Sequence, residues 1–257
     1  MSKQGPGQNS RDLARHECSL ILAGLAVPDD PHEAIHSVRK AIRRLRALLA
    51  LLERGNLDLR QIDRTLQRVG RSLSAVRDAH VVTEAAVTLQ AAHAEHDWAP
   101  VITAMAARRA RVLQKALRDD PAFSRRAHQV MRVAERLEQQ PWDNVKPADI
   151  QAALARSERR AHKAAKRAEK GDDPEAVHRW RRRVRRLRMQ LEALPHMGMK
   201  SAAGQGGKAG GSKRAKALHQ LSDRLGWSQD IRLLRNLVRS LPAWDGKPAI
   251  MQITKAP

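Results

Sequence analysis

The chain is poor in cysteine, aromatics and acidic residues. Its 257 residues include one cysteine, one phenylalanine, five tryptophans and no tyrosine. The lone Cys18 excludes an internal disulfide and is typical of a reducing compartment. No apolar run reaches the ~18 residues of a membrane-spanning helix, so no membrane span is expected. Only 27 acids oppose 49 Lys and Arg, and the resulting net charge of +22 indicates an anionic partner: nucleic acid, another polyphosphate or an acidic membrane surface.

The apolar residues that are present favour helices. Ala and Leu dominate, whereas the β-branched residues Val, Ile and Thr are sparse and no strand pattern occurs. The hydrophobic fraction of 42% is sufficient for a core. The sequence therefore predicts an all-α fold.

One short stretch occurs twice. Residues 33–46 and 175–188 match at an offset of 142 (178 − 36), and twelve of the fourteen positions keep their identity or type. A second segment repeats at an offset of 152, where Leu66, Val69, Leu73 and Asp78 correspond to Leu218, Leu221, Leu225 and Asp230. Repeats this far apart predict two related halves rather than a short-period solenoid.

Helical periodicity places basic side chains on one face of each copy. Successive residues advance by about 100° around a helix, which gathers the cations within an arc of about 120° and the apolar residues on the other side. The candidate binding residues are His36, Arg39, Lys40, Arg43 and Arg46 in the first copy, and His178, Arg181, Arg182, Arg185 and Arg188 in the second.

Such a stripe is unfavourable by itself, because like charges three and four residues apart repel. A solvated charged face is one interpretation, but the repetition of the stripe favours a surface that binds an anion. Arginine offers a planar fork for phosphate oxygens, and arginines one turn apart, about 5.4 Å, can follow a linear phosphate polymer. Weaker candidates are Arg64, Lys216, His162 and Lys163.

Turn and cap residues predict the chain's organisation. Residues 1–10 are polar and are expected to form a disordered tail, with the first helix from about Asp12. Residues 11–140 and 147–240 are expected to form the two halves. A Gly-rich loop at 198–212 is expected to be flexible, with the last helix from about Lys213, and 241–257 to form an extended tail.

The basic motifs resemble the CHAD family, the conserved histidine α-helical domain. Its signature is a histidine followed by spaced basic residues, and later a Leu/Gly-rich segment that ends in Arg-Asp, here Arg77-Asp78. The resemblance spans about 11–240 and implies two four-helix bundles related by a pseudo-twofold axis, with the basic helices lining a central cleft. It also implies binding of inorganic polyphosphate and association with cytoplasmic polyphosphate granules. The sequence departs from the pattern at Gln229, at Ser74-Ala75 and in its long Gly-rich insertion.

Two other functions compete with this one. Non-specific binding of DNA or RNA at low salt is compatible with the charge, although the basic segments have almost no aromatics for base stacking. A metal-dependent phosphoanhydride hydrolase would need a P-loop or metal-binding carboxylates, and neither pattern occurs. The sequence thus predicts a non-catalytic binding protein with no cofactor and no metal site.

Overall fold

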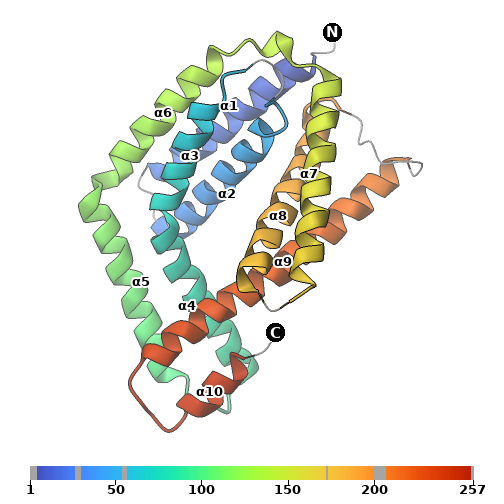
Figure 1. The fold of residues 1–257 in the computed structure, drawn as a ribbon. Helices are drawn as coiled ribbons and strands as arrows, with labels where there is room; N and C mark the ends of the chain where they lie inside the picture. Colours follow the sequence, from blue (N-terminus) through green and yellow to red (C-terminus); the bar gives the residue numbers. More distant parts are fainter. Residues whose placement is uncertain (1–4, 27–29, 54–56, 172, 200–206, 256–257) are drawn as a thin grey trace.

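The computed structural model describes residues 5–26, 30–53, 57–171, 173–199 and 207–255 (Figure 1). Within these ranges the chain forms ten α-helices, two short 3-10 turns and no strand, which confirms the all-α prediction. The helices are α1 (Pro6–Leu25), α2 (Pro31–Leu49), α3 (Arg60–Ser72), α4 (Ser74–Ala92), α5 (Ala99–Asp119), α6 (Ser124–Glu138), α7 (Pro147–Ala168), α8 (Pro174–His196), α9 (Gly207–Ser240) and α10 (Lys247–Ile253), and the 3-10 turns are η1 (Pro121–Phe123) and η2 (Trp142–Asn144).

The two basic helices, α2 and α8, begin in the same way. The Asp30 carboxylate accepts hydrogen bonds from the backbone N–H groups of His32 (2.9 Å) and Glu33 (3.2 Å). The Asp173 carboxylate accepts one from Glu175 N–H at 2.9 Å. A proline follows each cap at the first helical position, where its missing N–H costs nothing. The repeated cap sets the start of both basic stripes.

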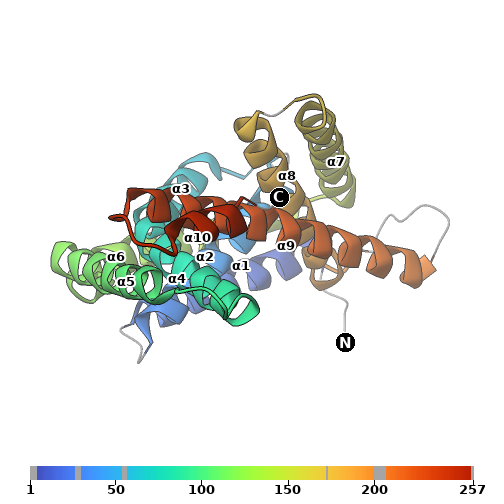
Figure 2. The same cartoon turned by 90° about the horizontal axis from the view of Figure 1, so that it is seen from below.

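Two helical hairpins form the centre of the molecule. The hairpin of α1 and α2 contacts the hairpin of α7 and α8, with α2 beside α8 (Figure 1). Helices α3 and α6 pack beside the first hairpin, whereas α4 and α5 extend away from it to meet α9. Seen from below, α9 crosses α4 and carries α10 beside it (Figure 2). The long α9 therefore ties the end of the chain to the first half.

The hydrophobic cores cross the predicted boundary between the halves. One buried cluster unites α1, α2, α3 and α6 with α7 and α8. A smaller cluster unites α4 and α5 with α9 and α10. Each core thus contains helices from both halves, so the halves are interlocked rather than independent. Cys18 is 2% exposed in the larger core, and burial raises the pKa of its thiol to about 12.

The prediction of a disordered tail at 1–10 is wrong for residues 6–10, which form the first turns of α1. Ser10 Oγ donates to the Pro6 carbonyl at 2.6 Å, and Gln8 Nε2 donates to Asp143 Oδ1 at 2.8 Å. Gly7 lies so close to η2 that a Cβ there would come within 1.9 Å of the Trp142 carbonyl oxygen. Residues 1–4 lie outside the described ranges. Docking against η2, a contact distant in sequence, orders this segment.

The two remaining loop predictions are also wrong in part. In the Gly-rich segment 198–212, residues 207–212 belong to α9, which starts six residues before Lys213; residues 200–206 lie outside the described ranges. The segment 241–257 contains α10, whose Ile250 is fully buried in the smaller core. Burial of one apolar side chain there outweighs the turn-forming composition of the segment. No helix in the described part of the chain is long and apolar enough to cross a membrane.

Candidate anion-binding cleft

A cleft of about 450 Å³ opens where α2 faces α8. Nine arginines and one histidine line it, against a single acidic residue, Asp78, among the described residues. The two repeated helices supply seven of the ten primary candidates: Arg39, Arg43, Arg46, His178, Arg181, Arg182 and Arg185. The prediction that the basic helices line one central cleft is therefore confirmed.

Three primary candidates lie outside the cleft lining. Lys40 is exposed on the outer side of α2. His36 is half-buried near Arg43 and Arg77, and burial lowers its pKa below the usual value. Arg188 contacts the ring of His219, and its Nε lies 3.7 Å from the Glu192 carboxylate. The angular position on the helix alone therefore does not decide which basic side chains reach the cleft.

The centre of the cleft is electrostatically strained. Burial, followed by the charges of neighbouring guanidiniums, lowers the pKa of Arg43 to about 10 and that of Arg185 to about 8. Burial also lowers the pKa of Arg181, which is only 6% exposed. Because each shift disfavours a positive charge, the cleft holds cations that the folded chain does not neutralise. An anion in this position would relieve their mutual repulsion.

Several of the cleft arginines are anchored by the chain itself, among them Arg46 and Arg39. Arg46 forms a two-point ion pair with Asp63, at 2.7 and 3.0 Å. Arg39 donates to Ser74 Oγ at 2.9 Å and to the Gly70 carbonyl, at the corner between α3 and α4. These bonds fix the positions of both guanidiniums in the cleft lining.

The aspartates of the second repeat pair with an arginine. Arg77 Nη1 lies 3.1 Å from Asp78 and 3.4 Å from Asp230, which joins α4 to α9 across the two halves. Burial raises the pKa of Asp230. Both aspartates thus have a structural role in this ion-pair arrangement. Gln229, which stands where the family pattern has an arginine, lines the cleft.

Sequence reasoning missed several lining residues. They come from α3, α4 and α8: Gln67, Arg71, Arg77 and Arg186. Arg186 belongs to the first repeat but falls outside the arc. Arg71 and Arg77 lie within the second repeated segment, so their position in a repeat was the signal that could have identified them. Of the weaker candidates, Arg64, His162 and Lys216 are exposed and lie outside the lining. Lys163 lines a neighbouring cavity.

The fold and cleft define an all-helical protein in which two repeated basic helices converge on one site. The sequence profile of the CHAD domain matches residues 11–239, so the chain belongs to the CHAD domain family. No curated protein matches the sequence. Among the described residues, no group of three or more His, Cys, Asp or Glu side chains is placed to hold a metal ion.

Two solved structures share the fold. The CHAD domain from the plant Ricinus communis is 18% identical with a TM-score of 0.67, over 98% of this chain and 86% of that one. PptA from Streptomyces chartreusis is 15% identical with a TM-score of 0.66, over 98% of this chain and 93% of that one. At this identity the likeness concerns the fold alone.

Proposed function

We propose that the protein binds inorganic polyphosphate in the α2–α8 cleft without turning it over, and that this binding associates it with polyphosphate granules in the cytoplasm. The observation that carries the proposal is that Arg43 and Arg185, two largely buried guanidiniums from different helices, both line the cleft, and that burial and the charges of neighbouring arginines lower both pKa values. A folded protein retains such an arrangement where a ligand supplies the missing negative charge.

The chemistry of the lining matches a linear phosphate polymer. Guanidinium groups donate paired hydrogen bonds to phosphate oxygens, and those of α2 and α8 approach the cleft from both sides. Polyphosphate repeats a negative charge along a chain without bases. Its recognition needs closely spaced donors and no stacking surface, and no Trp, Tyr or Phe is among the described lining residues.

Competition separates this function from nucleic-acid binding. The immobilised protein is challenged with long-chain polyphosphate, duplex DNA and tripolyphosphate over a salt series. We expect polyphosphate to displace DNA at every salt concentration, because a single phosphate chain can enter the cleft of about 450 Å³ whereas a DNA duplex can contact only the outer charges. Preference for DNA would reject the proposal.

A charge-reversal pair tests the site itself. Arg43→Glu with Arg185→Glu should abolish polyphosphate binding while helicity, measured by circular dichroism, is kept. The matched control is Arg64→Glu with Lys216→Glu, which changes the net charge equally at exposed positions outside the cleft. Equal loss in both variants would mean that overall charge, not the cleft, holds the polymer.

Turnover is tested separately. Polyphosphate is incubated with the protein and Mg²⁺ or Mn²⁺, and orthophosphate is measured over time. We expect no release above that of the Arg43→Glu/Arg185→Glu variant. Release that this variant abolishes would identify a hydrolase.

A further inference from the structure

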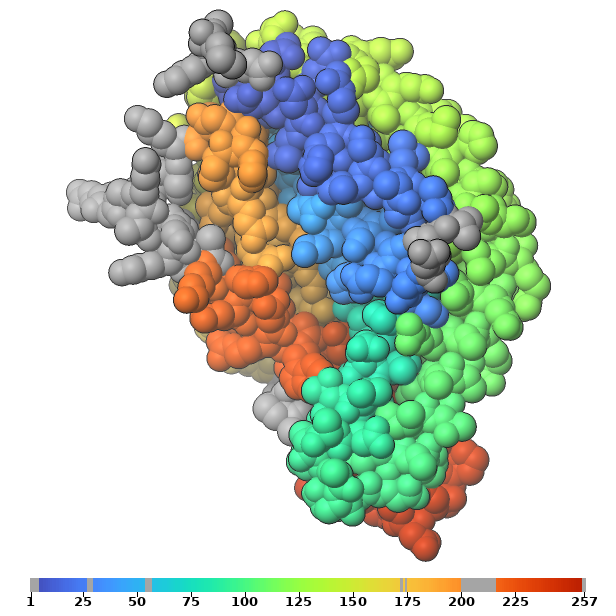
Figure 3. Space-filling model, turned by 180° about the vertical axis from the view of Figure 1, so that it is seen from behind, coloured from blue at the N-terminus to red at the C-terminus, as the bar shows by residue number. Residues whose placement is uncertain are grey.

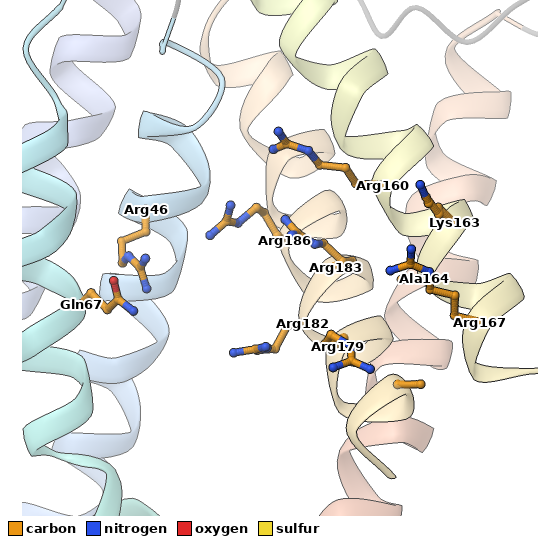
Figure 4. A pocket seen from close by; sticks show the side chains of 11 residues that line it. Arg46, Gln67, Arg160, Lys163, Ala164, Arg167, Arg179, Arg182, Arg183 and Arg186 are labelled. Atoms are coloured by element: carbon orange, nitrogen blue, oxygen red, sulfur yellow. The ribbon is translucent and has the colours of Figure 1, made fainter. Parts of the chain in front are cut away.

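A second cavity of about 510 Å³ adjoins the cleft on the side of α7. The two share four lining residues: Arg46, Gln67, Arg182 and Arg186. In Figure 4, Arg182 and Arg186 point from α8 toward Arg46 on α2. The labelled side chains of α7 lie to the right of them, farther from Arg46. The shared residues make one continuous space of the two cavities.

The second cavity is as cationic as the first. Eight of its eleven lining residues carry a positive charge: Arg46, Arg160, Lys163, Arg167, Arg179, Arg182, Arg183 and Arg186. No acidic side chain is among the described residues that line it. Arg179 pairs with Asp173 at 3.1 Å, outside the lining. Burial and nearby arginines lower the pKa values of Arg183 and Arg186. A bound anion would therefore stabilise these two positive charges as well.

The other half of the molecule lacks this extension. Arg44 corresponds to Arg186 at the repeat offset of 142, but Arg44 Nε lies 2.6 Å from the carboxylate of the buried Glu17 on α1. The cavity at that position lies on the side where α1 meets α8 (Figure 3), and three acids, Asp12, Glu17 and Glu192, line it together with Arg44, His16 and His196. An anionic chain leaving the cleft therefore meets cations toward α7 and carboxylates toward α1.

We propose that the cavity between α7 and α8 is an extension subsite for the same polyanion, entered from the cleft, which makes the protein select long phosphate chains over short ones. This rests on the proposed function of the cleft. A chain already held in the cleft presents its next phosphates to the subsite at a high effective concentration, so occupancy adds affinity. A ligand too short to reach past Arg182 gains nothing from it.

The test removes the charges that belong to the subsite alone. Arg160→Gln/Lys163→Gln/Arg167→Gln leaves the cleft lining unchanged. Its control, Arg111→Gln/Arg118→Gln/Arg132→Gln, removes three exposed charges on α5 and α6. Dissociation constants for long-chain polyphosphate and for tripolyphosphate are measured at one physiological salt concentration, with circular dichroism to verify folding.

We expect the subsite variant to lose about tenfold or more in affinity for the long chain, since three phosphate contacts disappear, and to keep its affinity for tripolyphosphate. The control should change both affinities by the same small factor. Equal long-chain affinities for the two variants would overturn the extension while leaving the cleft intact. Parallel loss of tripolyphosphate affinity in the subsite variant would overturn chain-length selection. Absence of binding to the wild-type protein would overturn the proposed function itself.

Discussion

At the scale of single residues, neighbouring arginines of α2 differ in whether a carboxylate neutralises their charge. Arg44 and Arg46 are neutralised by Glu17 and Asp63. Arg43, which directly precedes Arg44, lines the cleft with Arg185 and has its pKa lowered to about 10. The ion-paired arginines of α2 thus stabilise the fold, whereas Arg43 destabilises it. Ligand binding explains the presence of Arg43 but is not needed to explain the ion-paired arginines.

His178 should make polyphosphate binding dependent on pH. Burial and the charges of Arg182 and Arg181 lower its pKa in the free protein. A bound polyanion stabilises the imidazolium and raises that pKa, so binding takes up a proton and affinity increases as pH falls from about 8 toward about 6. Titration calorimetry across this range measures the slope, which His178→Gln should flatten. His162→Gln, at an exposed position outside the cleft, is the control. Protonation of the polyphosphate itself affects both variants equally. An unchanged slope in His178→Gln would contradict the assignment.

At the scale of helices, the same sequence signals produced different elements in the two halves. The segment around Leu73 ends α3 and starts α4, whereas its repeat around Leu225 lies within the continuous α9. In the first half, Arg39 binds Gly70 and Ser74 at this corner. Arg71 and Arg77 line the cleft beside this corner, whereas the corresponding residues of α9 are Asp223 and Gln229, of which Gln229 lines the cleft.

The start of α1 depends on one glycine. Gly7→Ala should lower the free energy of unfolding by about 1 to 3 kcal/mol, because the added Cβ would overlap the Trp142 carbonyl and force α1 away from η2. Thermal or denaturant unfolding measures the effect. Gly5→Ala is the matched control, since a Cβ at Gly5 meets nothing within 4 Å. Equal stabilities of the two variants would show that residues 6–10 do not dock as described.

At the scale of the whole molecule, the sequence predicted what local patterns control. The helix caps at Asp30 and Asp173 and the all-α fold follow from local composition and periodicity. The meeting of the two stripes in one cleft was implied by the family resemblance. Local patterns could not predict contacts between distant segments, such as the docking of Gly7 on Trp142, the burial of Ile250 and the path of α9. The α7 side of the cationic surface was missed for the same reason, because only packing brings Arg160 next to Arg186.

The number of charges that meet the polymer should appear in the salt dependence of binding. Each phosphate contact releases condensed counterions, so the logarithm of affinity falls linearly with the logarithm of salt concentration. Arg43→Gln with Arg185→Gln should reduce this slope by about 1 to 2, because two contacts are lost. Arg64→Gln with Lys216→Gln should leave the slope unchanged. Affinities at four or more salt concentrations measure both, and equal slopes would place the polymer outside the cleft.

The repelling guanidiniums at the centre of the fold also bear on how long a molecule survives. The unoccupied protein is its least stable form, and an anion present at a hundredfold excess over its dissociation constant adds about 2.7 kcal/mol. Proteases remove unfolded molecules irreversibly, so depletion of the polymer shortens the protein's lifetime. On the proposed function, we expect the abundance of this protein to follow the supply of polyphosphate without any change in its synthesis.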